Sequence, residues 1–422
     1  MLIGIDASRA NRSHKSGTEW YSYYIIRELA KLDKDNQYIL YTDKPLLSGL
    51  SDLSSDIIED KEPVFKDGWQ LIKSPYNNFK AKVLGWPFKF FWTQGRLSLE
   101  MLFSSPDVLF VPAHALPLIH PKKSVVTIHD IGFKREEKLY ERSSIGPEKK
   151  SYKSLLDFVV RLLTLGKYGA NTFDYLDWST SFSLHHAQVI ITISEFTKRE
   201  LGELYKADNN KVKVIYNGYP KDIYKLLTNK IEAERVLSSY GIKQPYVFYV
   251  GRLEKKKNIA MLIEAFHILK TRYTNLPHKL YLVGDASYGF DDIKYSIHGF
   301  HLQNDVFTTG WVKEEDLPYI FSCAVAFVFP SNYEGFGIPL LQAMATGVPI
   351  VASNAASIPE IAGDAAVLFD PADSTDMANA LASVLTDETL RKKLIEAGQK
   401  RIVNYSWSKC AQETLAFIKS LA

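Results

Sequence analysis

The chain has little cysteine and little excess charge of either sign. Its two cysteines, Cys323 and Cys410, stand alone among 422 residues and form no CxxC pair. This pattern excludes a disulfide framework and fits a reducing cytoplasm. The 51 basic and 48 acidic side chains leave a net charge of +3, and so small an excess disfavours nucleic acid as a partner. We therefore expect a cytoplasmic protein that does not bind nucleic acid.

The sequence also lacks a long, uninterrupted apolar segment. Its most apolar helical stretch, Leu155 to Leu165, contains Asp157 and Arg161 and is too short to cross a bilayer. The N-terminus opens on the apolar run Leu2–Asp6 instead of a basic region and a longer apolar one, so we expect no signal peptide. These observations leave open a helix that lies on a membrane. Because 46% of the residues are hydrophobic, we predict a globular protein with two cores.

Short apolar runs alternate with segments of helical periodicity along most of the chain. The runs are mostly continuous, as expected of parallel strands that are buried on both faces. The predicted strands are Leu2–Asp6, Gln37–Tyr41, Val108–Val111, Ser124–Ile128, Val189–Ile193, Val212–Ile215, Tyr246–Val250, Lys279–Val283, Ala324–Phe329, Pro349–Val351 and Ala366–Phe369. The helical patterns between them include Thr18–Leu32, Ile259–Thr271, Ile338–Thr346 and Ser374–Leu385. This alternation predicts an α/β fold with two doubly wound parallel sheets.

The two series of strands and helices meet near a turn-forming cluster, Tyr216–Pro220. We therefore predict a first domain over residues 1–217 and a second over residues 218–404. The last helical pattern, Trp407–Leu421, follows the apparent last helix of the second domain. We treat it separately, as residues 405–422.

Two insertions in the first domain, near residues 62–105 and 144–180, fit the sheet pattern poorly. The stretch Gln70–Leu99 has no acidic residue, and its aromatic residues are interleaved with Lys73, Lys80, Lys82, Lys89 and Arg96. The second insertion carries the amphipathic stretch Tyr152–Leu165. Interfacial helices combine basic and aromatic residues in this way, so both insertions are candidate membrane-docking or acceptor-binding elements. The alternative is a helical hairpin that is buried against the domain, with lysines extending from its rim.

The turn after the predicted strand Tyr246–Val250 is rich in cations. Gly251 permits a sharp exit from the strand, and Arg252 and Lys257 follow on a loop that opens a helix. Open parallel sheets bind ligands at the carboxyl ends of their strands, and the free amides of a helix start add positive potential. A planar guanidinium and a compact ammonium at such a place suit a diphosphate. The alternative is a solvated lysine cluster.

The segment from Phe329 to Ile350 places a carboxylate at a second strand end. Glu334 follows an apolar strand, and the glycines on either side of Phe336 allow the backbone to approach a ligand closely. Gln342 lies roughly one turn inside the following helix, on a face that can look toward the same ligand. The alternative is that Glu334 caps this helix and that Gln342 lies on its surface.

These motifs resemble those of the retaining GT-B glycosyltransferases of family 4, in the branch that includes bacterial mannosyl- and glucosyltransferases of polysaccharide assembly. The resemblance covers most of the chain and is strongest from Tyr246 to Pro371. The matching pieces are Val250–Leu253 with Lys257, Leu282–Asp285, Glu334–Pro339, Gly347–Ser353 and Ile358–Glu360, and more loosely Val126–Asp130 and Thr192–Thr197. The resemblance implies two Rossmann-like domains that face each other across a cleft. It assigns the acceptor to the first domain and the nucleotide sugar to the second, with the C-terminal helix crossing back to the first.

The resemblance also implies roles for individual residues. Arg252 and Lys257 would hold the donor diphosphate, Glu334 would bind the donor sugar, and His129 would line the sugar pocket from the first domain. The further donor-binding positions are Gly17, Gly251, Asp285, Gly335, Phe336, Gly337, Ile338 and Gln342. The alternative for His129 is a core histidine that bonds to a backbone carbonyl. Where the family often has a glycine pair, this chain has only Gly17, preceded by a serine.

The implied reaction is the transfer of a hexose, with mannose favoured, from a GDP- or UDP-linked donor. The implied acceptor is a hydroxyl of a saccharide or of a lipid-linked saccharide, at the inner face of the cell membrane. Transfer would retain the anomeric configuration and would need no metal or other cofactor, because the leaving phosphate is thought to take the acceptor proton.

One position departs from the family pattern. The family usually has a second glutamate eight residues after the first, which binds the nucleotide ribose, and this chain has Gln342 there. An amide offers one acceptor oxygen where a carboxylate offers two. We therefore expect weaker donor binding than with glutamate, so Gln342→Glu would tighten it.

Other classes of protein fit the sequence motifs less well. A G-x-G-x-x-G after the first strand would indicate an NAD-dependent dehydrogenase, and Gly4–Arg9 does not supply it. A P-loop kinase is excluded because G-x-x-x-x-G-K-[ST] is absent, and a sugar-nucleotide epimerase lacks the resemblance. The most serious rival is a GT-B protein that binds sugar nucleotides with weak activity or none.

Overall fold

The computed structural model describes residues 1–47, 49–55, 62–88, 90–146, 150–164, 166–227 and 229–421. The chain forms two compact units. The first unit comprises Met1–Arg135, Glu141–Asn217 and Trp407–Ala422, and the second comprises Glu136–Tyr140 and Gly218–Ser406. Among the basic residues of the predicted docking stretch, Lys89 lies outside the described residues.

Within the described residues, the first unit is built on a nine-stranded sheet with the order β3-β4-β5-β2-β1-β6-β7-β8-β9. Its strands are β1 (Leu2–Asp6), β2 (Gln37–Thr42), β3 (Phe65–Lys66), β4 (Trp69–Leu71), β5 (Phe79–Val83), β6 (Val108–Val111), β7 (Ser124–Ile128), β8 (Val189–Thr192) and β9 (Val212–Val214). In this order, every neighbouring pair from β5 through β2 and β1 to β9 is parallel. The pairs β3–β4 and β4–β5, at one edge, are antiparallel. The central strands β6 and β7 are buried along their whole length, which explains their continuous apolar runs.

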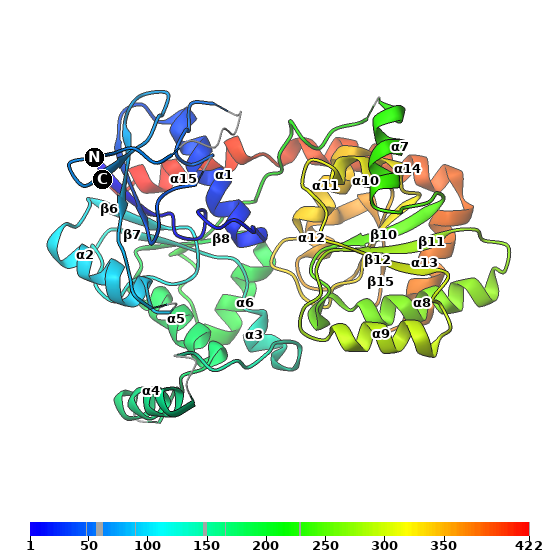
Figure 1. The fold of residues 1–422 in the computed structure, drawn as a ribbon, viewed down its shortest axis with the longest axis horizontal. Coiled ribbons are helices and arrows are strands. Elements are labelled where there is room, and N and C mark those ends of the chain that lie inside the picture. Colours follow the sequence, from blue (N-terminus) through cyan, green and yellow to red (C-terminus); the bar gives the residue numbers. More distant parts are fainter. Residues whose placement is uncertain are drawn as a thin grey trace. The chain divides into compact units, whose positions relative to one another are not determined.

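The helices of the first unit include its C-terminal one. They are α1 (Gly17–Leu32), α2 (Ser98–Phe103), α3 (Gly132–Arg135), α4 (Lys150–Leu163), α5 (Thr172–His186), α6 (Glu195–Tyr205) and α15 (Trp407–Lys419), with a π-helical turn, η1, at Thr93–Leu97. Figure 1 shows α15 lying beside α1. The Trp407 ring stacks on Tyr24 with ring centroids 5.3 Å apart and meets Tyr21 edge-on at 6.0 Å. The end of the chain therefore packs on the first unit.

The second unit is built on a six-stranded parallel sheet with the order β12-β11-β10-β13-β14-β15. Its strands are β10 (Tyr246–Val250), β11 (Lys279–Val283), β12 (Val306–Gly310), β13 (Ala326–Phe329), β14 (Ile350–Ser353) and β15 (Ala366–Phe369). The α-helices are α7 (Lys230–Ser239), α8 (Ile259–Arg272), α9 (Phe290–Gly299), α10 (Leu317–Cys323), α11 (Ile338–Thr346), α12 (Ile358–Ala362), α13 (Ser374–Thr386) and α14 (Glu388–Arg401). Short 3-10 turns are η2 (Glu137–Leu139), η3 (Lys255–Lys257), η4 (Gly363–Ala365) and η5 (Ile402–Asn404).

The predicted fold class, with two doubly wound parallel sheets, is confirmed. All the predicted strands overlap observed ones. Four observed strands were not predicted: β12, an edge strand whose middle residues are exposed, and β3 to β5. These strands lack a continuous apolar run because they are not buried on both faces.

The basic and aromatic stretch Gln70–Leu99 was expected to form interfacial or buried helices, but it is partly β-strand. Part of it forms β4 and β5, and the sequence of β5, Phe-Lys-Ala-Lys-Val, alternates with the period of a strand. Its cations interact within the protein. The Lys80 ammonium lies 3.9 Å from the centre of the Trp69 ring, and both Lys82 and Arg96 form ion pairs with Glu100. The helical interpretation is therefore wrong for residues 79–83.

The amphipathic stretch predicted at Tyr152–Leu165 forms a helix, α4, as far as Leu163, and Leu165 lies outside the described residues. Phe158 and Leu162, which are four residues apart and therefore on one face, are 63% and 64% exposed. Figure 1 shows α4 at the margin of the first unit, beyond α5. Across the described ranges, no helix has both the length and the apolar character that spanning a membrane requires.

Candidate functional site

An ion pair joins two loops of the second unit, the one predicted to carry cations and the one predicted to carry a carboxylate. The Lys257 ammonium lies 2.6 Å from Oε1 of Glu334, and both side chains are largely buried. Lys257 ends the turn η3 after β10, whereas Glu334 follows β13. A backbone hydrogen bond from Asn332 to the Lys256 carbonyl, 3.0 Å long, holds the two loops together. The structure thus brings two residues that are 77 positions apart into one site.

Arg252 lies on the same loop as Lys257 but differs from it in exposure and in its partners. The residue is exposed, and its carbonyl accepts a hydrogen bond of 3.1 Å from the Tyr249 hydroxyl. Among the described residues, the guanidinium has no hydrogen bond or ion pair. The group is therefore available to bind an anion, next to the start of α8, whose free amides add positive potential.

The loops after β10 and β11 cross at a point where only glycine fits. Gly251 and Gly284 have φ angles of +143° and +136°. A Cβ atom on Gly284 would lie 2.1 Å from the Gly251 carbonyl oxygen. Beside this crossing, the carbonyl of Asp285 accepts a hydrogen bond of 2.8 Å from Leu253, and its side chain is exposed. The close crossing fixes the course of the chain just before Arg252.

The start of α11 presents buried backbone beside Glu334. Ser357 donates a 2.9 Å hydrogen bond to the Glu334 carbonyl, which anchors the loop from the other side. Gly335, Phe336 and Gly337 are buried, and Gly337 precedes Ile338, the first helical residue. A helix start of this kind favours an anionic or hydroxylated ligand, because its backbone amides carry partial positive charge.

Gln342 is buried in α11 and contacts a carboxylate that the sequence analysis did not single out. Its amide nitrogen donates to Oε1 of Glu314 at 3.4 Å, and the Tyr224 hydroxyl donates to the same oxygen at 2.7 Å. Burial raises the pKa of Glu314, and the bond from Tyr224 opposes that rise. Glu314 follows β12, the strand that the sequence analysis missed, so no strand end marked it as a site residue.

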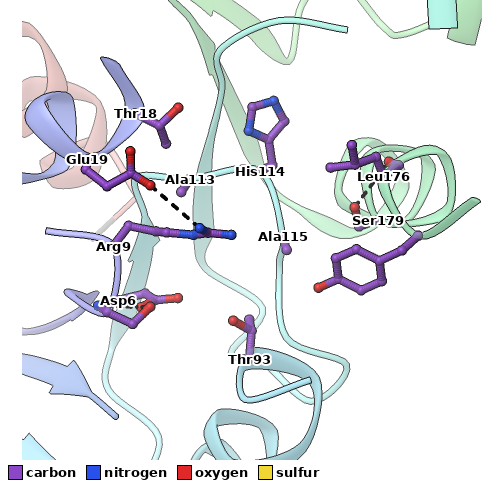
Figure 2. Close-up of a pocket in the computed structure, with 12 residues that line it drawn as sticks. Asp6, Arg9, Thr18, Glu19, Thr93, Ala113, His114, Ala115, Leu176 and Ser179 are labelled. Carbon is purple, nitrogen blue, oxygen red and sulfur yellow. Dashed lines mark hydrogen bonds and ion pairs between the residues drawn. The ribbon is translucent and has the colours of Figure 1, made fainter. Parts of the chain in front are cut away.

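The first unit contains a polar pocket of about 200 Å³ (Figure 2). Its lining includes Asp6, Arg9, Thr18, Glu19 and Tyr175. Asp6 is the last residue of β1 and accepts hydrogen bonds from the backbone and hydroxyl of Ser8, at 3.0 and 2.6 Å. Burial raises the pKa of this carboxyl despite both bonds. The pocket therefore lies at a strand's carboxyl end, where open sheets bind ligands.

An ion pair crosses this pocket. Arg9 lies 3.6 Å from Glu19, as the dashed line in Figure 2 shows. Burial alone would raise the pKa of Glu19, but the hydrogen bonds from Ser16 and the charge of Arg9 outweigh it and lower the pKa. Asp6 ends a predicted strand and Arg9 follows it by three residues, so their position was the signal that could have identified them.

His129 and Gly17 take different places around the pocket. His129 is 5% exposed, and its Nε2 lies 2.8 Å from the Pro112 carbonyl. Burial lowers its pKa to about 4. His129 is not among the residues that line this pocket; its neighbour His114 is, with Nε2 on the Asp130 carbonyl. Gly17 begins α1, is exposed and precedes Thr18 of the lining.

Two protein-family models match this chain. The model described as "Glycosyl transferases group 1" matches residues 230–401, and the model described as "Glycosyltransferase Family 4" matches residues 15–222. Together they cover most of the sequence. The match over residues 230–401 lies within the second structural unit. The match over residues 15–222 lies within the first unit, except for Glu136–Tyr140 and its last five residues, which belong to the second.

Several curated proteins are similar in sequence. O-antigen chain mannosyltransferase B of Escherichia coli is 28% identical over 58% of this chain and 64% of its own length. An uncharacterized glycosyltransferase of Methanocaldococcus jannaschii is 30% identical over 56% of this chain and 61% of its own. Both matches span less than two thirds of the relative. O-antigen chain mannosyltransferase RfbU of Salmonella typhimurium is 22% identical over 80% of this chain and 78% of its own.

Solved structures share the fold along the whole chain. Sucrose-phosphate synthase from Thermosynechococcus elongatus has a TM-score of 0.70 at 18% identity, covering 100% of this chain and 99% of its own. WaaG, a glycosyltransferase involved in lipopolysaccharide biosynthesis, has a TM-score of 0.67 at 14% identity. Anabaena Alr3699/HepE, in complex with UDP and glucose, has a TM-score of 0.65 at 16% identity. Each of these two covers 99% of both chains.

The glycine crossing yields a stability prediction. Gly284→Ala places a methyl group against the Gly251 carbonyl and strains a positive φ, so we expect a loss of at least about 2 kcal/mol in the free energy of unfolding. Gly299→Ala is the matched control, because a Cβ there meets open space. Chemical denaturation of both variants measures the effect. Equal stabilities would show that the loops do not depend on this crossing.

Proposed function

Because this chain belongs to glycosyltransferase family 4 and has the GT-B fold, we propose that it transfers a hexose, with mannose favoured, from a nucleotide diphosphate sugar. The acceptor in this proposal is a hydroxyl of a saccharide or a lipid-linked saccharide in cell-surface polysaccharide assembly. The names of the mannosyltransferase relatives support mannose and polysaccharide assembly. The observation that carries the proposal is the Lys257–Glu334 pair, with the exposed Arg252 on the loop of Lys257 and without an ion-pair partner among the described residues.

The donor would bind with its diphosphate against Arg252 and Lys257. As the sugar–phosphate bond breaks, negative charge grows on the leaving diphosphate. These two cations therefore interact more strongly with the transition state than with the bound donor. Glu334 would then accept hydrogen bonds from sugar hydroxyls while the Phe336 and Gly337 amides donate. The 2.6 Å ion pair orients the Lys257 ammonium before the donor arrives.

The family resemblance supports retention of the anomeric configuration. In this mechanism the acceptor oxygen forms its bond to the anomeric carbon on the face that the phosphate leaves. The leaving phosphate oxygen takes the acceptor proton, so the protein supplies charge stabilisation and no separate base. We propose that a metal is not required, since Arg252 and Lys257 already place positive charge at the diphosphate.

We propose that the pocket of the first unit receives a sugar of the acceptor. Asp6 and Glu19 can accept hydrogen bonds from hydroxyl groups, and Arg9 can donate. Two carboxylates against one guanidinium disfavour an anionic ligand, so the pocket suits a neutral saccharide. Tyr175 adds an aromatic ring to the lining.

A lipid-linked acceptor would bring the enzyme to the inner face of the cell membrane. The exposed apolar face of α4, with Phe158 and Leu162, supports such contact better than the stretch Gln70–Leu99, whose cations interact within the protein. Lys153, on the same helix, and Lys167, shortly after it, add positive charge, which favours anionic lipids.

The donor site predicts a large and selective effect of Lys257→Ala. Without the ammonium, charge on the leaving diphosphate loses a stabilising partner, so kcat should fall by about 100-fold or more. Lys255→Ala is the matched control, because Lys255 is exposed on the same turn. Release of nucleotide from UDP- and GDP-linked hexoses, with and without a chelator, measures both variants.

Equal loss in both variants would contradict the assigned role of Lys257. Failure of the wild type to release nucleotide from any of these donors, despite binding them, would favour the alternative of a GT-B protein that binds sugar nucleotides without effective catalysis. Activity abolished by the chelator would contradict metal independence.

The acceptor pocket predicts a change in KM without a change in donor chemistry. Arg9→Ala removes a hydrogen-bond donor, so KM for a methyl hexoside acceptor should rise by about fivefold or more. Slow hydrolysis of the donor should stay within about twofold, since water needs no pocket. Arg12→Ala is the matched control, because Arg12 pairs with Asp43 and does not line the pocket. An unchanged KM for Arg9→Ala would place the acceptor elsewhere.

Membrane contact predicts selective binding to anionic vesicles. The wild type should sediment with vesicles that contain phosphatidylglycerol and less with purely zwitterionic ones. Replacing both Phe158 and Leu162 with glutamate should abolish this binding, whereas Ile231→Glu, at a residue 82% exposed in the second unit, should not. Equal sedimentation with and without anionic lipid would count against the membrane proposal.

A further inference from the structure

The buried Gln342 and the half-buried Glu314 form a pair of polar side chains at the edge of the second unit's sheet where its strands end. Gln342 lies in the second turn of α11, and Glu314 lies on the loop that follows β12. The Gln342 amide nitrogen donates to Oε1 of Glu314 at 3.4 Å across a separation of 28 residues. The loop after β12 is tied to the glycine crossing, because the Gly284 amide donates to the Gly310 carbonyl at 2.9 Å. Both side chains therefore belong to the carboxyl edge of the sheet.

This contact fixes which atoms the pair presents. The amide nitrogen of Gln342 is occupied by Glu314, so the amide carbonyl oxygen is directed away from that bond. On Glu314, both donors, Tyr224 and Gln342, use Oε1. Within the described part of the chain, Oε2 of Glu314 and Oε1 of Gln342 accept no hydrogen bond. The pair thus offers two acceptor oxygens on neighbouring side chains.

We infer that Glu314 and Gln342 together bind the vicinal diol of the donor ribose, with Glu314 supplying the carboxylate. This inference rests on the proposed function, which assigns the donor to the second unit. Two adjacent hydroxyls each have a proton to donate, and the pair has two oxygens to receive them. Arg252 and Lys257 are assigned to the diphosphate and Glu334 to the hexose, so the ribose is the remaining part of the donor with a vicinal diol.

The pair also changes the expectation for Gln342→Glu. That substitution alone would set two carboxylates against each other, and like charges at this distance disfavour ionisation of both. We therefore expect no gain in donor affinity from Gln342→Glu while Glu314 is present. The negative charge that Gln342 lacks is already supplied from the neighbouring loop.

Exchanging the two residues tests the inference. Calorimetry with UDP and GDP measures the affinity of the wild type, E314Q, the exchange variant E314Q/Q342E and the control E315Q. Glu315 neighbours Glu314, but its side chain is 76% exposed and its ion-pair partner is Lys313. E314Q should weaken binding of the preferred nucleotide by about tenfold, since a hydrogen bond to a charged group is lost. The exchange variant keeps one carboxylate and one amide and should return to within about twofold of the wild type.

Deoxynucleotides give a second measurement that does not depend on the folding of a variant. The wild type should bind the 2′-deoxy form of its preferred nucleotide about tenfold more weakly, and E314Q should lose this discrimination. The inference is overturned if E314Q binds like E315Q, if the exchange variant is no better than E314Q, or if the wild type binds both sugar forms equally. If the wild type binds neither UDP nor GDP, the proposed function fails instead.

Discussion

The ion pair between Lys257 and Glu334 is the interaction on which the proposed donor site depends. It joins loops from two separate strands of one sheet and removes both charges largely from water. Losing either partner would leave the other as an uncompensated charge, which is far more costly than losing a surface ion pair. The pair therefore fixes both loops, and it holds a cation and an acid at a set separation, as the proposed contacts with the phosphate and the sugar of the donor require.

Backbone contacts supply the rest of this geometry. The glycine crossing between the loops after β10 and β11, the bond from Asn332 to Lys256, and the serine that anchors the Glu334 carbonyl connect four strand ends. A parallel sheet brings these ends to one edge, so contacts between loops decide where each side chain lies. The result is a rigid edge that leaves Arg252 exposed as the adaptable partner of an anion.

The two units differ in the charge they offer a ligand. The second presents an exposed arginine and a lysine beside one acid, which suits a diphosphate. The first presents two carboxylates and one arginine in a small pocket, which suits hydroxyl groups. An anionic donor and a neutral acceptor would thus be distinguished by charge as well as by shape.

The sequence alone determined the elements whose signals are local. Continuous apolar runs identified the buried parallel strands, and the helix predicted at Ile338–Thr346 has those bounds in the structure. Arg252, Lys257 and Glu334 could be named because each follows such a strand. Tertiary structure decided which residues meet. Glu314 follows an exposed edge strand, and its contact with Gln342 spans 28 residues; the pocket of Asp6, Arg9 and Glu19 joins a strand end to a helix. Hydrophobic periodicity reports burial along one segment, whereas such contacts depend on the order and register of strands across a whole sheet.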